Sequence, residues 1–186
     1  MTEEWDEARS IQAAKADPDA FGALYEAYVD RIYSYIYHRV GNVHDAEDLT
    51  SRTFFRAMAH LPTYEDKGIP FSAWLYRIAH NLIANFHRDR QRRSVVALDG
   101  ILVGTLPEHH PEVLAEAQDD TKLLAEEVAK LDATRRELLV LKFSEGLSNA
   151  EIGAILGRSE GAIKSLYHRT LLQIRKDMQK RGLKPE

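Results

Sequence analysis

Residues 148–169 have the pattern of two short helices joined by a tight turn, and few folds accommodate that arrangement. Ser148 and Glu151 have the spacing of a capping box, which predicts the start of the first helix. Gly157 is placed to end that helix in the left-handed conformation, and Ser159 to cap the next one. Together these signals predict a helix-turn-helix, a unit that places its second helix in the major groove of DNA. An ordinary helical hairpin with a glycine turn is the alternative.

Helical periodicity divides the second helix of this unit into two faces. We expect the inward face to carry Ala162, Ile163, Leu166 and Thr170. The outward and turn positions carry polar and basic side chains, which are candidate DNA contacts: Arg158, Ser159, Glu160, Lys164, Ser165, His168 and Arg169. Lys164 and Glu160 suit base edges, whereas Arg158 and Arg169 suit phosphates.

Charge is segregated along the 186 residues, although the formal net charge is only −4. Residues 61–93 carry 6 basic and 3 acidic side chains, and residues 135–186 carry 11 and 6. Residues 1–60 and 94–134 are acidic. Basic blocks suit contacts with nucleic-acid phosphates, whereas acidic blocks suit a protein partner or simple solvation.

Composition excludes several classes of protein. The absence of cysteine excludes disulfides, thiolate zinc sites and a cysteine nucleophile. The N-terminus is acidic, unlike a signal peptide, and no apolar run approaches the ~20 residues of a membrane span. We therefore expect a cytoplasmic protein without membrane insertion. His109 and His110 imitate a metal site, but we expect no metal or other cofactor because no fixed scaffold surrounds them.

Helical periodicity dominates the rest of the chain, and no segment predicts a strand. The prediction is an all-α protein with two small helical domains, residues 1–93 and 113–186. Prolines and glycines replace the helical pattern in residues 94–112, which predicts a flexible linker. The expected helices outside the helix-turn-helix cover residues 17–39, 44–60, 71–93, 111–130 and 133–144.

Apolar residues three and four positions apart define the core that we expect for these helices. In the first domain they are Phe21, Leu24, Tyr25, Tyr28, Ile32, Tyr35, Ile36, Ala46, Leu49, Phe54, Ala57, Met58, Trp74, Leu75, Ile78, Leu82, Ile83 and Phe86. In the second they are Leu138, Leu139, Leu141, Phe143, Ile152, Ile155 and Leu156.

Three motifs occur in a particular order. The first is Asp45-Ala46-Glu47-Asp48-Leu49 followed by Phe54-Phe55-Arg56-Ala57, and the second is residues 71–81. The third is the helix-turn-helix, preceded by Leu139, Leu141, Lys142 and Phe143. In order, spacing and linker, the set resembles the extracytoplasmic-function sigma factors of bacterial RNA polymerase, over nearly all of residues 10–180. The resemblance implies a protein without a catalytic centre that binds core polymerase, directs it to promoters and helps to melt them.

The first motif, through this resemblance, implies docking on a coiled coil of the polymerase clamp. The residues concerned are Asp45, Glu47, Asp48 and Leu49. An acidic first turn also complements the helix dipole, and both roles can hold at once. Where the family often has a further acid or glutamine, this chain has Ser51 and Arg52. Arg52 lies four residues after Asp48, so we expect an intrahelical ion pair.

The second motif, through the resemblance, implies reading and melting of the −10 promoter element. Unstacked bases need flat surfaces and the strands need positive charge, so aromatic and basic side chains suit the task. The candidate contacts are Arg77, His80, Asn81, Asn85, Arg88, Arg90, Arg92 and Arg93. Asn81 matches the asparagine associated with the pocket for a flipped base, and the loop of residues 62–70 would form its wall. We expect Trp74 to pack in the core.

The third motif implies that the helix of residues 159–181 reads the −35 element. The resemblance also implies contact with the polymerase flap and inhibition by an anti-sigma factor. Two other classes of protein compete with this interpretation. One is an autonomous helix-turn-helix regulator, in which the other two motifs would have no role. The other is a helical histidine/aspartate metal hydrolase, but His38, His44 and His60 lack the spacing of ligands on facing helices.

Overall fold

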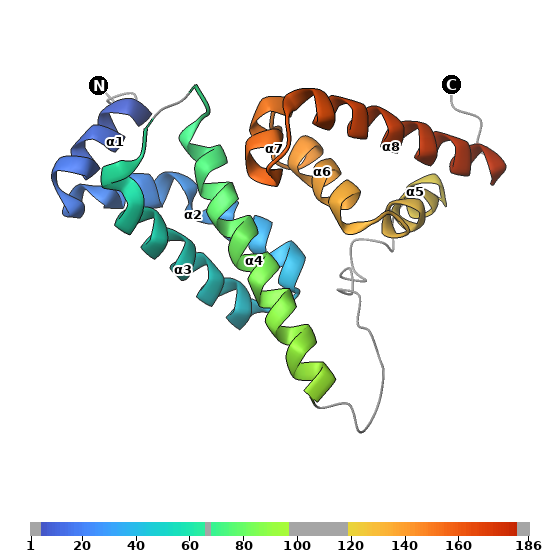
Figure 1. Ribbon diagram of the computed structural model, residues 1–186, viewed down its shortest axis with the longest axis horizontal. Helices are drawn as coiled ribbons and strands as arrows, with labels where there is room; N and C mark the ends of the chain where they lie inside the picture. The colour runs from blue at the N-terminus through green and yellow to red at the C-terminus, as the bar shows by residue number, and fades with distance from the viewer. Residues whose placement is uncertain (1–4, 66–67, 97–118, 182–186) are drawn as a thin grey trace. The chain divides into compact units, whose positions relative to one another are not determined.

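The computed structural model describes residues 5–65, 68–96 and 119–181, apart from the side chains of residues 91–96 and 119–123. The chain divides into two compact units, Met1–Pro107 and Glu108–Glu186. Every regular element within the described residues is a helix (Figure 1), which confirms the predicted all-α class. Most of the predicted linker, and the predicted start of a helix at Pro111, lie outside the described residues.

The described residues of unit 1 form four α-helices: α1 (Glu7–Ala16), α2 (Gly22–Val40), α3 (Val43–His60) and α4 (Phe71–Val96). The sequence pattern did not predict α1, and α4 continues past the predicted end at Arg93. At the predicted helix start, Asp17 caps a 3₁₀ turn, Pro18–Phe21, by accepting from the backbone N–H of Asp19, and α2 follows directly from Gly22.

Local signals fix the boundary between α2 and α3. Gly41 ends α2 in the left-handed conformation, with a φ of 66°, which a residue without a Cβ adopts without strain. Asn42 then caps α3, because its side chain accepts from the backbone N–H of Asp45 at 3.1 Å. The predicted break at Gly41-Asn42 is therefore confirmed.

The core of unit 1 lies where α2, α3 and α4 pack together. Its largest fully buried side chains include Tyr35, Tyr76 and Phe71. The prediction that Tyr25 and Met58 lie in the core is wrong, because Tyr25 is 43% exposed and Met58 is 40% exposed. Other predicted core residues on α4 are only half-buried, namely Trp74, Ile78 and Phe86. Tyr76, which the pattern did not single out, fills the core and lies edge-on to Tyr35.

Unit 2 contains α5 (Asp119–Ala129), α6 (Ala133–Phe143), α7 (Asn149–Leu156) and α8 (Glu160–Lys180). Leu138, Leu141, Ile152 and Ile163 are fully buried where α6, α7 and α8 meet. Phe143 was predicted to be apolar core but is 66% exposed, because it ends α6 at the surface.

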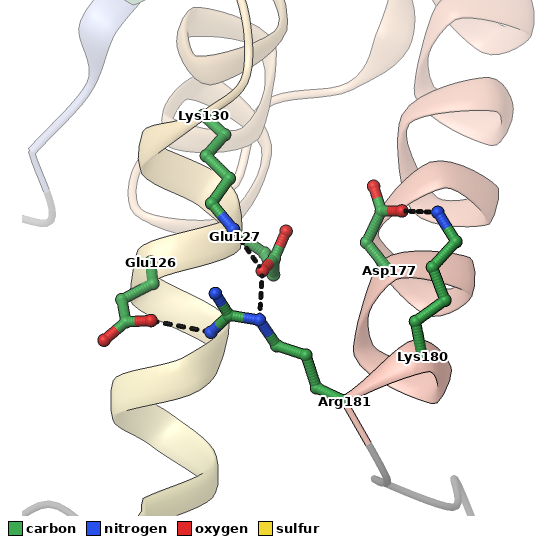
Figure 2. Close-up of polar contacts among 6 residues, drawn as sticks. All are labelled: Glu126, Glu127, Lys130, Asp177, Lys180 and Arg181. Atoms are coloured by element: carbon green, nitrogen blue, oxygen red, sulfur yellow. Dashed lines mark hydrogen bonds and ion pairs between the residues drawn. The ribbon is translucent and has the colours of Figure 1, made fainter.

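An ion-pair cluster fastens the end of α8 to α5 (Figure 2). Arg181 contacts Glu126 at 2.6 Å and Glu127 at 2.9 Å, and Lys130 contacts Glu127 at 2.7 Å. Glu127 is only 5% exposed, so its carboxylate needs these two cations to offset the loss of water. The hydrogen bond to Glu126 is the main cause of the raised pKa of Arg181.

Candidate nucleic-acid and partner interfaces

The helix-turn-helix of α7 and α8 has the caps that the sequence predicts. The Ser148 hydroxyl accepts from the backbone N–H of Glu151 at 3.2 Å, and the Glu151 carboxylate accepts from the backbone N–H of Ser148 at 2.7 Å. Gly157 has a φ of 66° and ends α7. The Ser159 hydroxyl accepts from the backbone N–H of Ala162 at 3.3 Å and caps α8. The predicted capping box, glycine turn and second cap are confirmed.

Gly153 is a residue of this unit that the sequence analysis missed. It is buried in the middle of α7, and a Cβ built on it would lie 2.6 Å from the backbone carbonyl oxygen of Arg158. Glycine inside a helix costs about 0.5–1 kcal/mol relative to alanine. That cost is offset here, because only glycine lets the turn fold back against α7. An isolated glycine within a helical pattern was the available signal.

The outward face of α8 is built largely as predicted. Ile163 and Thr170 are fully buried, Leu166 is half-buried, and Ala162 is exposed, so its predicted inward position is wrong. The exposed side chains are those of Arg158, Ser159, Glu160, Lys164, Ser165, His168 and Arg169. They form one polar surface along the first half of α8, free of cover from the rest of unit 2. Arg169 donates from Nε to the backbone carbonyl of Ser165 at 3.2 Å, which holds its guanidinium along the helix.

The candidate −10 residues lie along α4. Arg77, Asn81, Asn85 and Arg88 are exposed at spacings of three and four, and therefore share a face, while His80 is half-buried. Arg88 donates to the Asn85 side chain at 2.9 Å. The side chains of Arg92 and Arg93 lie outside the described residues, so their contacts stay a prediction.

An aromatic cluster stands at the start of α4, beside the loop that enters it. The Tyr64 ring lies 5.4 Å from Phe71 and 4.9 Å from Trp74, and Phe71 lies 5.3 Å from Trp74. Phe71 and Tyr64 are buried, whereas Trp74 is half-buried. The predicted core role of Trp74 therefore holds only in part.

Basic side chains lie close to the acidic face of α3. Arg52 contacts Asp48 at 3.2 Å, which confirms the predicted intrahelical pair, and His44 lies 3.9 Å from Glu47. Arg90 of α4 lies 4.0 Å from Asp45, which the pattern did not predict. These pairs are exposed, so water screens them and their contribution to stability is small.

Leu49 was predicted to contact the polymerase, but its burial does not fit that role. Its side chain is only 1% exposed, because it faces α2 and α4 from the inner side of α3. Leu49 therefore holds the acidic face in place and offers no surface to a partner. Asp45 is half-buried, whereas Glu47 and Asp48 are exposed.

A groove between α2 and α3 extends this acidic face. Apolar side chains line it, among them Tyr25, Val29, Phe55 and Met58, and Phe55 is 68% exposed. Its acidic lining residues are Asp19, Glu26, Asp30 and Glu47. Tyr25 and Met58 were predicted to lie in the core, and Phe55 was given no surface role. No local signal marked Phe55 as exposed, because adjacent residues on one helix can both be buried, as Tyr35 and Ile36 are.

Two further kinds of site are absent from the described part of the chain. There, no three or more His, Cys, Asp and Glu side chains gather into a group that could hold a metal ion. None of the described helices is long and apolar enough to cross a membrane. His109 and His110 lie outside the described residues.

A helix-turn-helix in one unit, together with an aromatic and basic helix in the other, is the architecture of a helical DNA-binding protein. Family models agree: one described as Sigma-70 region 2 matches residues 24–93, and one described as Sigma-70, region 4 matches residues 121–174.

Two relatives show the same similarity over most of the chain. It is 38% identical over 170 residues to the ECF RNA polymerase sigma factor BldN of Streptomyces coelicolor, covering 89% of this chain and 64% of BldN. It is 34% identical over 180 residues to the ECF RNA polymerase sigma factor SigW of Bacillus subtilis, covering 91% and 95%. The chain belongs to the extracytoplasmic-function sigma factors, a family that directs RNA polymerase to promoters.

A solved structure shows the same fold. The sigma factor RpoE, co-crystallised with the anti-sigma factor NepR from Bartonella quintana, has a TM-score of 0.64 and 24% identity. The match covers 86% of this chain and 96% of that one. The family does not favour the autonomous regulator, and its members are generally regulators without catalytic activity.

Proposed function

We propose that unit 1 docks on core RNA polymerase through α3. The supporting observation is that the exposed acid Glu47, which precedes the exposed Asp48, lines a groove together with the exposed apolar side chains Phe55 and Met58. Apolar side chains at the centre of a contact and charges at its rim are the usual anatomy of a protein interface. A coiled coil of the polymerase clamp is the partner that the family implies.

The same unit reads and melts the −10 element through α4. Its exposed face combines Arg77, Asn81 and Arg88 beside the aromatic cluster of Tyr64, Phe71 and Trp74. Cations attract the phosphates, and the Asn81 amide can both donate to and accept from the edge of an unstacked base. The loop of residues 62–70, of which residues 66 and 67 lie outside the described part of the chain, is the wall of the base pocket that the family implies.

Unit 2 reads the −35 element through α8. The outward face is exposed, begins at a capped N-terminus and carries Lys164 and Arg169. Entry into the major groove by the N-terminal half of this helix matches how helix-turn-helix units dock. The polymerase flap is a further contact of unit 2. The units correspond to sigma domains at residues 1–93 and 113–186, joined by the linker 94–112.

An anti-sigma factor is a further partner. RpoE, whose fold this chain shares, was crystallised with the anti-sigma factor NepR. The sigma factor CnrH, with a TM-score of 0.63 and 24% identity, was solved with the cytosolic domain of CnrY. A covering partner would mask the exposed groove and the outward faces until a signal releases them. We place this activity in the cytoplasm, with the polymerase and the chromosome.

The observation that carries this function is the joint presence of the polar α8 face and the aromatic and basic α4 helix in a single chain. Run-off transcription with core polymerase on genomic fragments, followed by mapping of the start sites, tests it. We expect starts that share sequence elements near −35 and −10 and that disappear without the protein. Specific binding of the isolated protein to duplex DNA, with no effect on polymerase, would instead favour the autonomous regulator.

A further inference from the structure

Helix α1 holds the chain at the point where it enters the loop before α4. Lys15, in the last turn of α1, donates from Nζ to the backbone carbonyl of Tyr64 at 2.5 Å. The two residues are 49 positions apart in the sequence. The same Nζ lies 5.7 Å from the centroid of the Tyr64 ring. One cation therefore contacts both the main chain and the side chain of Tyr64.

Tyr64 transmits this contact to α4. Its side chain is buried, and its ring packs 5.4 Å from Phe71 and 4.9 Å from Trp74 in the first turn of that helix. Phe71 in turn lies 5.8 Å from Tyr28 of α2. A displacement of Tyr64 would therefore disturb the aromatic side chains that set the loop against α4.

Helix α1 is itself held against the rest of unit 1, so the position of Lys15 is fixed. Asp6 caps the helix by accepting from the backbone N–H of Arg9 at 3.1 Å, and Ile11 is buried beneath it. The Tyr28 hydroxyl donates to the Glu7 carboxylate. Burial, and then this hydrogen bond, raises the pKa of Tyr28, so the phenol keeps the proton that it donates.

We propose that Lys15 is a positioning residue for promoter melting. It fixes Tyr64 and, through Tyr64, the aromatic side chains of Phe71 and Trp74, so that the aromatic cluster at the start of α4 is set before DNA arrives. This inference rests on the proposed role of α4 at the −10 element. Pre-organisation matters because side chains that are ordered only on binding subtract their ordering entropy from the affinity.

Three variants test the proposal: Lys15→Met, Lys15→Arg and Gln12→Met. Lys15→Met removes the donor but keeps the apolar stem, whereas Lys15→Arg keeps a cationic donor. Gln12→Met is the matched control, because it places the same side chain at an exposed position of α1.

The first measurement needs no polymerase. The chain has two tryptophans, so a Trp5→Phe background leaves Trp74 as the sole emitter. We expect Lys15→Met, with unchanged far-UV circular dichroism, to shift the Trp74 emission, and Gln12→Met to leave it unchanged. Unchanged Trp74 emission in Lys15→Met would overturn the positioning role.

The second measurement uses holoenzyme on a duplex promoter, with permanganate reporting opening and footprinting reporting occupancy. We expect Lys15→Met to lower opening about tenfold at equal occupancy, the order of one charge-assisted hydrogen bond. Lys15→Arg should recover most of the opening. Wild-type opening in Lys15→Met, or an equal fall in opening and occupancy, would overturn the proposal. If the wild-type protein opens no promoter, the proposed function itself is wrong, and the unmutated protein alone reveals this.

Discussion

At the scale of single residues, the two candidate DNA surfaces differ in what their side chains can read. On α4 an amide, Asn81, stands among cations beside an aromatic cluster. On α8 a lysine and a glutamate lie at the exposed N-terminal half, with arginines at its borders. A base edge in the major groove is read by hydrogen bonds, whereas phosphates are held by charge.

Replacing Asn81 by alanine should lower open-complex formation far more than closed-complex binding. The reason is that a contact with a flipped base exists only after the base has left the stack, a step that itself costs a few kcal/mol. Asn81 is exposed, so the substitution should leave the fold intact. Permanganate footprinting of the promoter bubble measures the effect. An equal loss on duplex and pre-melted templates would count against a base pocket.

Substitutions on α8 should distinguish the side chains that select bases from those that bind phosphates. Lys164→Ala should relax the preference at one or two base pairs, each worth ~1–3 kcal/mol, because lysine can donate to guanine. Arg169→Ala should weaken binding to all promoters about equally. It should also flatten the salt dependence of that binding, because a protein that contacts one phosphate fewer releases fewer counterions when it binds. Transcription from a library randomised across the −35 element measures both. The reverse pattern, with sequence preference changed only by Arg169→Ala, would refute this division.

At the scale of secondary-structure elements, the turn between α7 and α8 depends on a close approach of two backbones. The backbone N–H of Arg158 donates to the carbonyl of Gly153 at 2.9 Å, and the carbonyl oxygen of Arg158 lies 2.6 Å from the position that a Cβ on Gly153 would take. The close approach of the turn to α7 therefore requires a residue without a Cβ at position 153.

The substitution Gly153→Ala should destabilise unit 2 by about 1–3 kcal/mol, the usual cost of overpacking, because the new Cβ meets rigid backbone. Gly161 is the matched control, since a Cβ there meets nothing within 4 Å and its φ is not positive. Gly161→Ala should be neutral or stabilising, by up to ~1 kcal/mol. Urea unfolding followed by circular dichroism measures both. Equal stability of the two variants would show that the turn relaxes freely.

The sequence was most informative about elements whose signals are local. Caps at Ser148 and Ser159 and the turn at Gly157 depend on residues within four positions of one another, and all three were predicted. Helix α1 was missed, because only Ile11 and Ala14 of its ten residues are buried, too few for a periodic pattern.

Exposure and long-range contacts were harder to predict, because they depend on packing between distant segments. Tyr25, Met58 and Phe143 are apolar residues at helical spacing, yet the elements around them leave them open to solvent. The contact between Lys15 and Tyr64 spans 49 positions and leaves no periodic signal. The candidate sites were placed mainly through the family's motifs, and the groove beside α3 emerged only from the structure.

At the scale of the whole molecule, the segregation of charge makes different surfaces suitable for different partners. The acidic face and apolar groove of α3 suit a protein, whereas the exposed faces of α4 and α8 carry the cations that suit DNA. A net charge of −4 thus describes neither surface.

Reversing both Asp45 and Asp48 to lysine should weaken binding to core polymerase while leaving the fold intact. The reversal removes complementarity at the rim of the docking face, which mainly slows association. The pairs that it breaks, with Arg90 and Arg52, are exposed and contribute little to stability. Native-gel titration against core enzyme measures the affinity, with circular dichroism as the check of folding. Unchanged affinity in a normally folded double variant would remove α3 from the docking surface.

The cluster that joins Arg181 to Glu126 and Glu127 has a consequence for the rigidity of unit 2. Helix α8 is 21 residues long, about 30 Å, with its exposed polar face in the first half and this anchor at the far end. Contacts with α6 and α7 also hold α8, and the anchor adds an attachment at its C-terminal end that limits tilting of the helix. Under the proposed −35 role, Glu127 therefore supports base reading from the opposite end of α8.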